Sequence, residues 1–133
     1  GCTYFNEWAG LYGLPKEDMV LHLEESIASS VSTSMDHTVS SHQWGLSGIT
    51  AVGTLHLDQA QVCSVTAAPL FGDVKVLFLS ADGTSLLWTT DDSANLPLPA
   101  GTHTVYCVGK HFWGSMRAET PTPFHPACEK AFL

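Results

Sequence analysis

Residues 74–90 read Val-Lys-Val-Leu-Phe-Leu-Ser-Ala-Asp-Gly-Thr-Ser-Leu-Leu-Trp-Thr-Thr, and this stretch predicts a β-hairpin. The run 74–79 is largely apolar on both faces, which is typical of a central strand that is covered on each side. Asp82-Gly83 separates this strand from a second one over 84–90, and Asp-Gly between two such runs is a strong hairpin signal. We therefore expect strands in this part of the chain.

Alternation of side chains predicts more strands on both sides of this hairpin. Residues 31–39 read Val-Ser-Thr-Ser-Met-Asp-His-Thr-Val, so that the odd positions form one face and the even positions the other. Because a strand places successive side chains on opposite faces, this run predicts one strand with a covered face and a wet face. Looser alternation over 19–24 and 49–58 predicts further strands.

Turn residues divide the chain into strand-length pieces. Gly45, Gly48 and Gly53 predict bends or a bulge, and Pro99-Ala-Gly101 predicts a turn before a β-rich run. About eight strands result, which favours an all-β fold: an antiparallel, jelly-roll-like β-sandwich that forms a single domain over residues 1–133. We also expect one short helix near Phe5–Tyr12 and an extended, proline-rich tail over 120–126.

The stretch 73–108 resembles a pattern found in extracellular bacterial β-sandwich modules. Its parts are an apolar strand, the Asp82-Gly83 turn, a second strand, a polar loop, and Leu-Pro-Ala-Gly-Thr leading into another strand. Domains that follow secreted peptidases and some carbohydrate-binding modules share this shape. The resemblance implies a jelly-roll-like sandwich, and it assigns no functional residue.

The charge of the chain excludes one class of partner. Thirteen acids oppose five bases, for a formal net charge of −8, and no Lys or Arg lies between Lys16 and Lys75. Nucleic-acid binding relies on clustered Lys and Arg that displace counterions, so we expect none here. An anionic membrane surface is disfavoured for the same reason. No apolar run approaches the ~18–20 residues of a membrane span.

Four cysteines allow three pairings. Cys63 and Cys107 lie inside apolar strand patterns, whereas Cys2 and Cys128 lie near the two ends. We expect a Cys63–Cys107 disulfide across the core and a Cys2–Cys128 disulfide at the termini, in a protein that is secreted or extracellular. The alternative is a cytoplasmic protein with four reduced, buried thiols, because a core readily accepts cysteine as a small hydrophobe.

Seven histidines raise the alternative of a small metal-dependent, cupin-like β-barrel enzyme. Cupins need a His-x-His motif, which this chain lacks, and Pro99-Ala-Gly101-Thr-His103 is one residue short of their second motif. A shift of one residue moves a strand side chain to the other face. No nucleophile elbow or phosphate loop occurs either. We therefore expect no metal, no cofactor and no catalytic residue, and the reading leans away from an enzyme.

Tryptophans provide the better functional signal. Trp44 follows His42 at a turn, and Trp113 follows Phe112 near the end of a strand. Large amphipathic rings at such positions anchor protein partners or stack on sugars. We therefore expect a non-catalytic binding or protein-interaction domain whose contact surface holds Trp44, His42, Phe112 and Trp113. A carbohydrate-binding module is the alternative within this class, and the oligomeric state is open.

Overall fold

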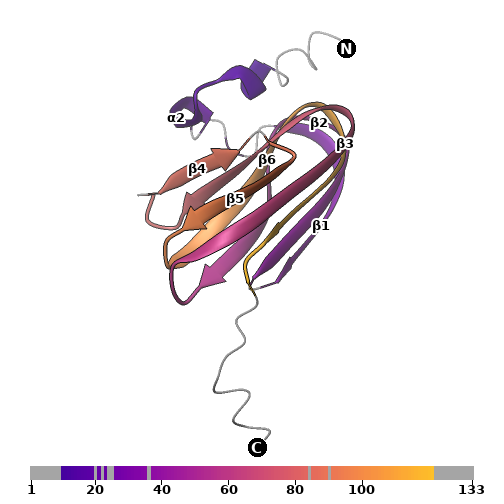
Figure 1. Ribbon diagram of the computed structural model, residues 1–133. Helices are drawn as coiled ribbons and strands as arrows, with labels where there is room; N and C mark the ends of the chain where they lie inside the picture. Colours follow the sequence, from indigo (N-terminus) through magenta and orange to yellow (C-terminus); the bar gives the residue numbers. More distant parts are fainter. Residues whose placement is uncertain are drawn as a thin grey trace, which may run out of the picture.

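The computed structural model describes residues 10–19, 21, 23, 26–35, 37–83, 85–89 and 91–121. Two short helical elements precede the strands: η1 (Leu11–Gly13) and α2 (Lys16–Met19). The strands that follow are β1 (Ser26–Met35), β2 (Thr38–Leu57), β3 (Gln61–Ser80), β4 (Leu86–Thr89), β5 (Ser93–Leu98) and β6 (Gly101–Glu119). Figure 1 shows the strands stacked beside the N-terminal helical elements. The described part of the chain is thus dominated by β-structure.

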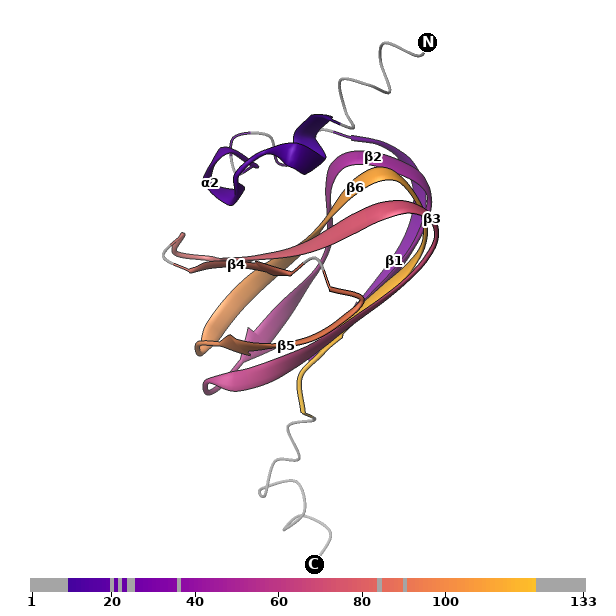
Figure 2. The same ribbon diagram turned by 45° about the horizontal axis from the view of Figure 1, so that its top comes forward.

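One antiparallel sheet folds over to form two layers. Its strand order is β1-β2-β6-β3-β4, and β5 also pairs with β3. The long strands β2, β6 and β3 curve midway along their length, as Figure 2 shows. The first layer holds β1, β5 and residues 38–44, 61–68 and 113–119, whereas the second holds β4 and residues 49–57, 74–80 and 101–109. The predicted antiparallel β-sandwich is confirmed.

The number of strands in the described residues is six rather than about eight, because β2, β3 and β6 each serve both layers. The register of the sheet shifts at the bend, between Trp44 and Gly48 in β2 and between Pro69 and Asp73 in β3. A further shift precedes Gly53. The bulges expected from the glycines of this section are confirmed.

Gly72 shows why the bend needs a glycine. Its φ of +76° lies in the left-handed region, which a side chain disfavours. A Cβ at this position would also collide with the backbone carbonyl of His111 on the neighbouring strand β6. The strands β3 and β6 therefore approach each other at the bend only because residue 72 carries no side chain.

The core lies between the layers. It is built from inward-facing side chains of both layers, among them Val39, Leu46, Leu55, Cys63, Val65, Val76, Phe78, Val105, Cys107 and Phe112. A second cluster lies on the outer side of the second layer, where Met19 packs with Ile49, Leu77, Tyr106 and Val108. The second layer is therefore covered on both faces, as the apolar run 74–79 predicted.

Local predictions met mixed outcomes. The hairpin over 74–90 is confirmed, with Leu79 opposite Leu86. The single strand over 31–39 is wrong: β1 ends at Met35 and β2 begins at Thr38, opposite it. A turn of two residues moves the odd positions to the other face, so Val31 and Met35 are exposed whereas Val39 is buried. Met19 ends α2 and begins no strand.

Two expected segments fall partly outside the described residues. Of the helix expected near Phe5–Tyr12, the structure describes only the end, where Leu11–Gly13 form η1. The tail beyond residue 121 is not described. Among the described residues, no helix is long and apolar enough to cross a membrane.

Candidate binding face on the first layer

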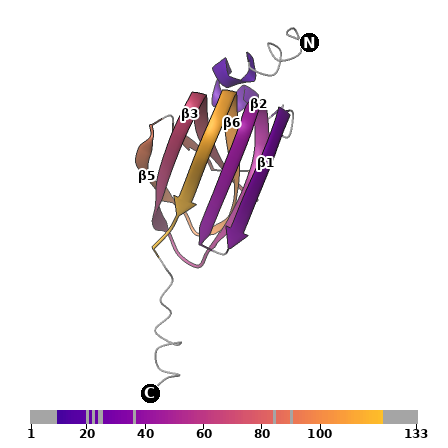
Figure 3. The same cartoon turned by 90° about the vertical axis from the view of Figure 1, so that its right-hand side faces the viewer.

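The outer face of the first layer carries side chains in rows that cross the strands. Figure 3 looks onto this layer, with β3, β6, β2 and β1 side by side. Trp44 of β2 lies opposite Trp113 of β6, and Trp113 lies opposite Phe71 of β3. Because directly opposed residues of antiparallel strands point to the same side, the three rings form an aromatic row. We call this surface the outer face.

Two polar rows follow the aromatic row along the strands. In the first of them, His42 lies opposite Val31 on one side and opposite Ser115 on the other. In the second, Ser40 lies opposite Arg117, which in turn lies opposite Thr66. The outer face therefore passes from aromatic rings to hydroxyl, imidazole and guanidinium groups within a few residues.

Exposed apolar side chains gather on this face. The described residues include eight large hydrophobic side chains that are exposed, and seven of them lie on the first layer or at its bend. These seven are Val31, Met35, Trp44, Val62, Leu70, Phe71 and Trp113. The eighth, Leu21, belongs to the N-terminal segment. An apolar patch left open to solvent on one face usually marks a binding surface.

The two indoles of the row are held in place without being buried. Trp44 is 41% exposed and Trp113 is 45% exposed. The ring of His42 lies against Trp44, with 4.8 Å between the ring centroids and a tilt of 41°. The ring of Trp113 lies over Gly45, where three of its atoms come within 3.5 Å of the place a Cβ would occupy. Both rings are thus supported from below and open to a ligand from above.

A shallow hollow of about 370 Å³ adjoins the aromatic row. Four strands contribute to its lining, which includes five Ser and Thr residues. The residues are Val31, Thr33, Ser40, Ser41, His42, Thr66, Ala67, Ala68, Ser115, Met116 and Arg117. The outer face therefore combines protruding rings with a depression beside them.

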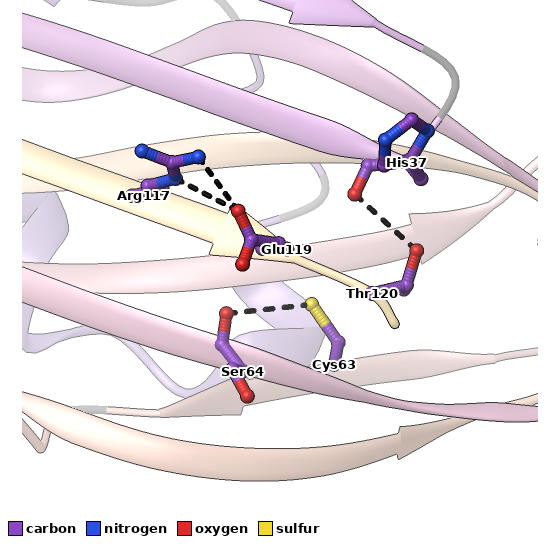
Figure 4. A network of polar contacts seen from close by, with 6 residues as sticks. All are labelled: His37, Cys63, Ser64, Arg117, Glu119 and Thr120. Carbon is purple, nitrogen blue, oxygen red and sulfur yellow. Dashed lines mark hydrogen bonds and ion pairs between the residues drawn. The ribbon is translucent and has the colours of Figure 1, made fainter. Parts of the chain in front are cut away.

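One ion pair provides the fixed charges beside the hollow. Both the Nε and the Nη2 of Arg117 donate to Oε2 of Glu119, over 3.1 and 2.7 Å. Figure 4 shows this pair near the end of β6, close to the hydrogen bond that Thr120 donates to the carbonyl of His37. The two side chains are 59% and 46% exposed. The pair orients the guanidinium and leaves this part of the outer face without net charge.

The matching face of the second layer is already covered. The Nζ of Lys75 donates to the carbonyl oxygen of Tyr12 over 2.6 Å and lies 4.3 Å from the ring centroids of both Tyr12 and Trp88. Desolvation lowers the pKa of Lys75 and, together with the charge of Asp73, raises the pKa of Tyr12. The N-terminal segment thus covers the second layer on the side that points away from the core. The described residues leave the outer face of the first layer open.

The structure brings three of the four expected contact residues together. Trp44, His42 and Trp113 all lie exposed on the outer face. The prediction that Phe112 belongs to the contact surface is wrong, because its side chain is fully buried in the core. Since adjacent residues of a strand point to opposite faces, the neighbour of an outward Trp113 must point inward.

Sequence reasoning missed several residues of this face, among them Phe71 and Arg117. Phe71 is 69% exposed. The register shift before it turns its ring outward. Arg117 was missed because a lone cation in a strand has no distinctive pattern. A signal for Phe71 was available in Pro69 and Gly72, which flank it and mark an interrupted strand.

The expected Cys63–Cys107 disulfide is wrong, because both residues are free, buried thiols. Cys63 lies in the first layer opposite Leu96, and Cys107 lies in the second layer opposite Val76. An apolar strand environment accepts a thiol as a small hydrophobe, so the pattern was no evidence for a bond. Burial raises the pKa of Cys63 to about 11 and that of Cys107 to about 12. Cys2 and Cys128 lie outside the described residues.

The histidines do not form a common site in the part of the chain that is described. His103 is buried and its Nε2 donates to the carbonyl of Pro99, whereas His56 contacts a hydroxyl of β6 and His42 lies on the outer face. Within the described ranges, no group of three or more His, Cys, Asp or Glu side chains could hold a metal ion. The cupin-like alternative therefore finds no ligand set among these residues.

Comparisons with solved structures find remote structural likenesses, among them the following two. The pre-peptidase C-terminal domain of a collagenase from Bacillus anthracis is 11% identical, with a TM-score of 0.40, over 72% of this chain and 89% of that chain. A cupin domain from Bordetella pertussis Tohama I is also 11% identical, with a TM-score of 0.33, over 73% of this chain and 94% of that chain. No protein-family model and no curated protein matches the sequence.

Proposed function

We propose that this chain is a non-catalytic binding domain that docks a protein partner on the outer face of its first layer. The observation that carries the proposal is the gathering of seven exposed large hydrophobic side chains on the first layer and at its bend. Trp and Arg dominate the residues that contribute most to protein interfaces, and Trp44, Trp113 and Arg117 lie together on this face. An extracellular location belongs to the same proposal, although buried free thiols suit either compartment.

The proposal is supported by a contrast between the two layers. On the second layer, the side that points away from the core packs against Tyr12 and Met19 of the N-terminal segment. The outer face has no such cover among the described residues, yet it carries aliphatic as well as aromatic side chains. Aliphatic groups such as Val31 and Met35 favour a protein partner, because sugars offer them few apolar contacts.

Selection of peptides on the intact chain tests this function. A phage-displayed random-peptide library is selected on the wild-type chain and then screened on the variants Trp44→Ala and Trp113→Ala. We expect the selected peptides to bind each variant at least about tenfold more weakly, since such anchors contribute about 1.4 kcal/mol or more. Leu21→Ala, which removes a more exposed apolar side chain of the N-terminal segment, should leave binding unchanged.

Thermal unfolding of the same variants separates binding from stability. Both indoles are about half exposed, so their removal should leave the melting temperature nearly unchanged. A core tryptophan would behave differently, because its truncation leaves a cavity that costs about 3–5 kcal/mol. Peptides that bind the tryptophan variants as tightly as the wild type would refute the proposal.

A carbohydrate ligand is the second candidate, and the hollow favours it. Thr33, Ser40, Thr66 and Ser115 bring hydroxyl groups to a depression that lies beside two open indoles. Such a site could stack the apolar face of a sugar and hydrogen-bond its hydroxyls. Titration with cellohexaose and with chitohexaose, followed by tryptophan fluorescence, tests it. A saturable change that Trp44→Ala abolishes would favour this ligand over a protein.

A further inference from the structure

We propose that the partner of the outer face is a second copy of this chain, packed face to face about a two-fold axis. This inference rests on the proposed function and names its partner. The inference is based on the outer face itself, which carries both the exposed tryptophan rings and a depression that could receive them. Trp44 and Trp113 protrude, and the hollow of about 370 Å³ begins in the next row. An interface between identical copies requires this self-complementarity.

The spacing of the rows fits a two-fold axis. On β6, Trp113 and Arg117 lie two residues on either side of Ser115, which is opposite His42. On β2, Trp44 and Ser40 lie two residues on either side of His42. An axis laid along the row of His42 and Ser115 therefore brings the aromatic row of each copy over the row of Ser40 and Arg117 of the other. The strands of the copies then run along a common direction, close to the aligned packing of β-sheets.

The chemistry at the superposed rows is complementary. Arg117 of one copy meets the ring of Trp113 of the other, and a guanidinium stacks well on an indole. Glu119 already orients this guanidinium through two hydrogen bonds. The ion pair also makes this part of the face electrically neutral. For a chain with a formal net charge of −8, a neutral face is where a like-charged copy can approach.

The size of the face suits a weak to moderate dimer. Five strands about 4.8 Å apart, each contributing about six residues at about 3.3 Å, span roughly 24 Å by 20 Å. The flat area is about 480 Å² per copy, and the relief of the side chains adds to it. Stable interfaces bury about 800 Å² per partner, so we expect association that depends on protein concentration.

Sedimentation velocity of the full chain from about 1 μM to about 1 mM tests the inference, because that range covers weak dimers. We expect the wild type to shift from monomer to dimer with rising concentration. Trp113→Ala and Arg117→Ala should each weaken dimerisation by about tenfold. Arg117→Lys keeps the charge but loses the planar group, so it should restore only part of the affinity. Leu21→Ala is the matched control and should dimerise like the wild type.

The outcomes of these experiments distinguish a failure of the second-copy inference from a failure of the proposed binding function. A chain that stays monomeric at every concentration overturns the second-copy inference, and so does a dimer that neither Trp113→Ala nor Arg117→Ala weakens. If the monomeric chain still selects peptides that depend on Trp44 and Trp113, the binding function stands and its partner is a different protein. If it selects none, both fail. Because the side chain of Arg117 is exposed, Arg117→Ala should fold and can test the inference even if Trp113→Ala fails to fold.

Discussion

Ser34 on β1 makes two hydrogen bonds to the backbone of Thr54 on β2: its Oγ donates to the carbonyl oxygen over 3.0 Å and accepts from the amide over 3.0 Å. Ser34 belongs to the first layer and Thr54 to the second, so the two bonds join the layers along one side of the sandwich. Thr54 pairs with strand β6 on one side. On its other side, the hydroxyl of Ser34 takes the hydrogen bonds of the Thr54 backbone.

Replacing Ser34 with alanine should therefore weaken the join between the layers. Loss of two hydrogen bonds to backbone groups should lower the free energy of unfolding by about 1–2 kcal/mol, since the site is partly open to water. Urea denaturation measures the change. Ser30→Ala, at an exposed position of the same strand, should change stability by less than about 0.5 kcal/mol. Equal effects of the two substitutions would show that the bonds to Thr54 contribute nothing.

Gly72 and Gly83 form a matched pair for testing the bend. Both adopt a positive φ, +76° and +75°, but only a Cβ at Gly72 would collide with the neighbouring strand, whereas at Gly83 it meets nothing within 4 Å. Gly83→Ala should cost about 1 kcal/mol from backbone strain alone. Gly72→Ala should cost about 2–4 kcal/mol, because the strands must also separate. Chemical denaturation of both variants gives the difference, and no difference would contradict the close approach at the bend.

The buried thiols predict a loss of stability at high pH. An unfolded cysteine titrates near 9.0, whereas burial raises the pKa of Cys63 to about 11 and that of Cys107 to about 12. As the pH rises above 9.0, the unfolded chain releases these protons first, so stability falls toward pH 11. Below that window the contribution is constant. The variant Cys63→Ala/Cys107→Ala should lose stability less steeply over the same range, whatever its stability at neutral pH. Parallel curves would contradict the prediction.

Lys75 should hold the N-terminal segment against the second layer. Lys75→Ala removes the hydrogen bond to the Tyr12 carbonyl and the contacts with two rings, together worth about 1–3 kcal/mol. Hydrogen exchange of the amides in residues 10–19 should then speed up by about tenfold or more, while exchange in β6 changes little. Lys110→Ala, at an exposed lysine on β6, is the control. Unchanged exchange in residues 10–19 would show that other contacts hold the segment.

Local patterns predicted the elements better than their partners. Asp82-Gly83 marked a hairpin whose two strands pair as expected, and Pro99-Ala-Gly101 marked the start of β6. These signals act within a few residues, because turn geometry depends on the φ angles that the turn residues can adopt. The same reasoning failed at residues 31–39, where a turn of two residues exchanges the faces of the odd and even positions.

The candidate site was predictable in its residue types and not in its layout. Trp44 was expected at a turn and Trp113 near the end of a strand, but both lie within long strands, where they are opposite each other on β2 and β6. Which of Phe112 and Trp113 points outward depends on the register of β6 after the bend, where His111 has a φ of 54°. A shift of one residue exchanges the two faces, so only the pairing of the strands decides it.

By itself, the sequence determined that the chain is acidic and forms antiparallel strands, because charge and short-range alternation are properties of the chain. The tertiary structure decided the rest. The bend of β2, β3 and β6 determines which half of each strand lies in which layer, and with it which rings reach solvent. The state of Cys63 and Cys107 and the cover over the second layer likewise depend on contacts between residues far apart in the chain. Such contacts leave no periodic trace in the sequence, since they arise only once the sheet has folded over on itself.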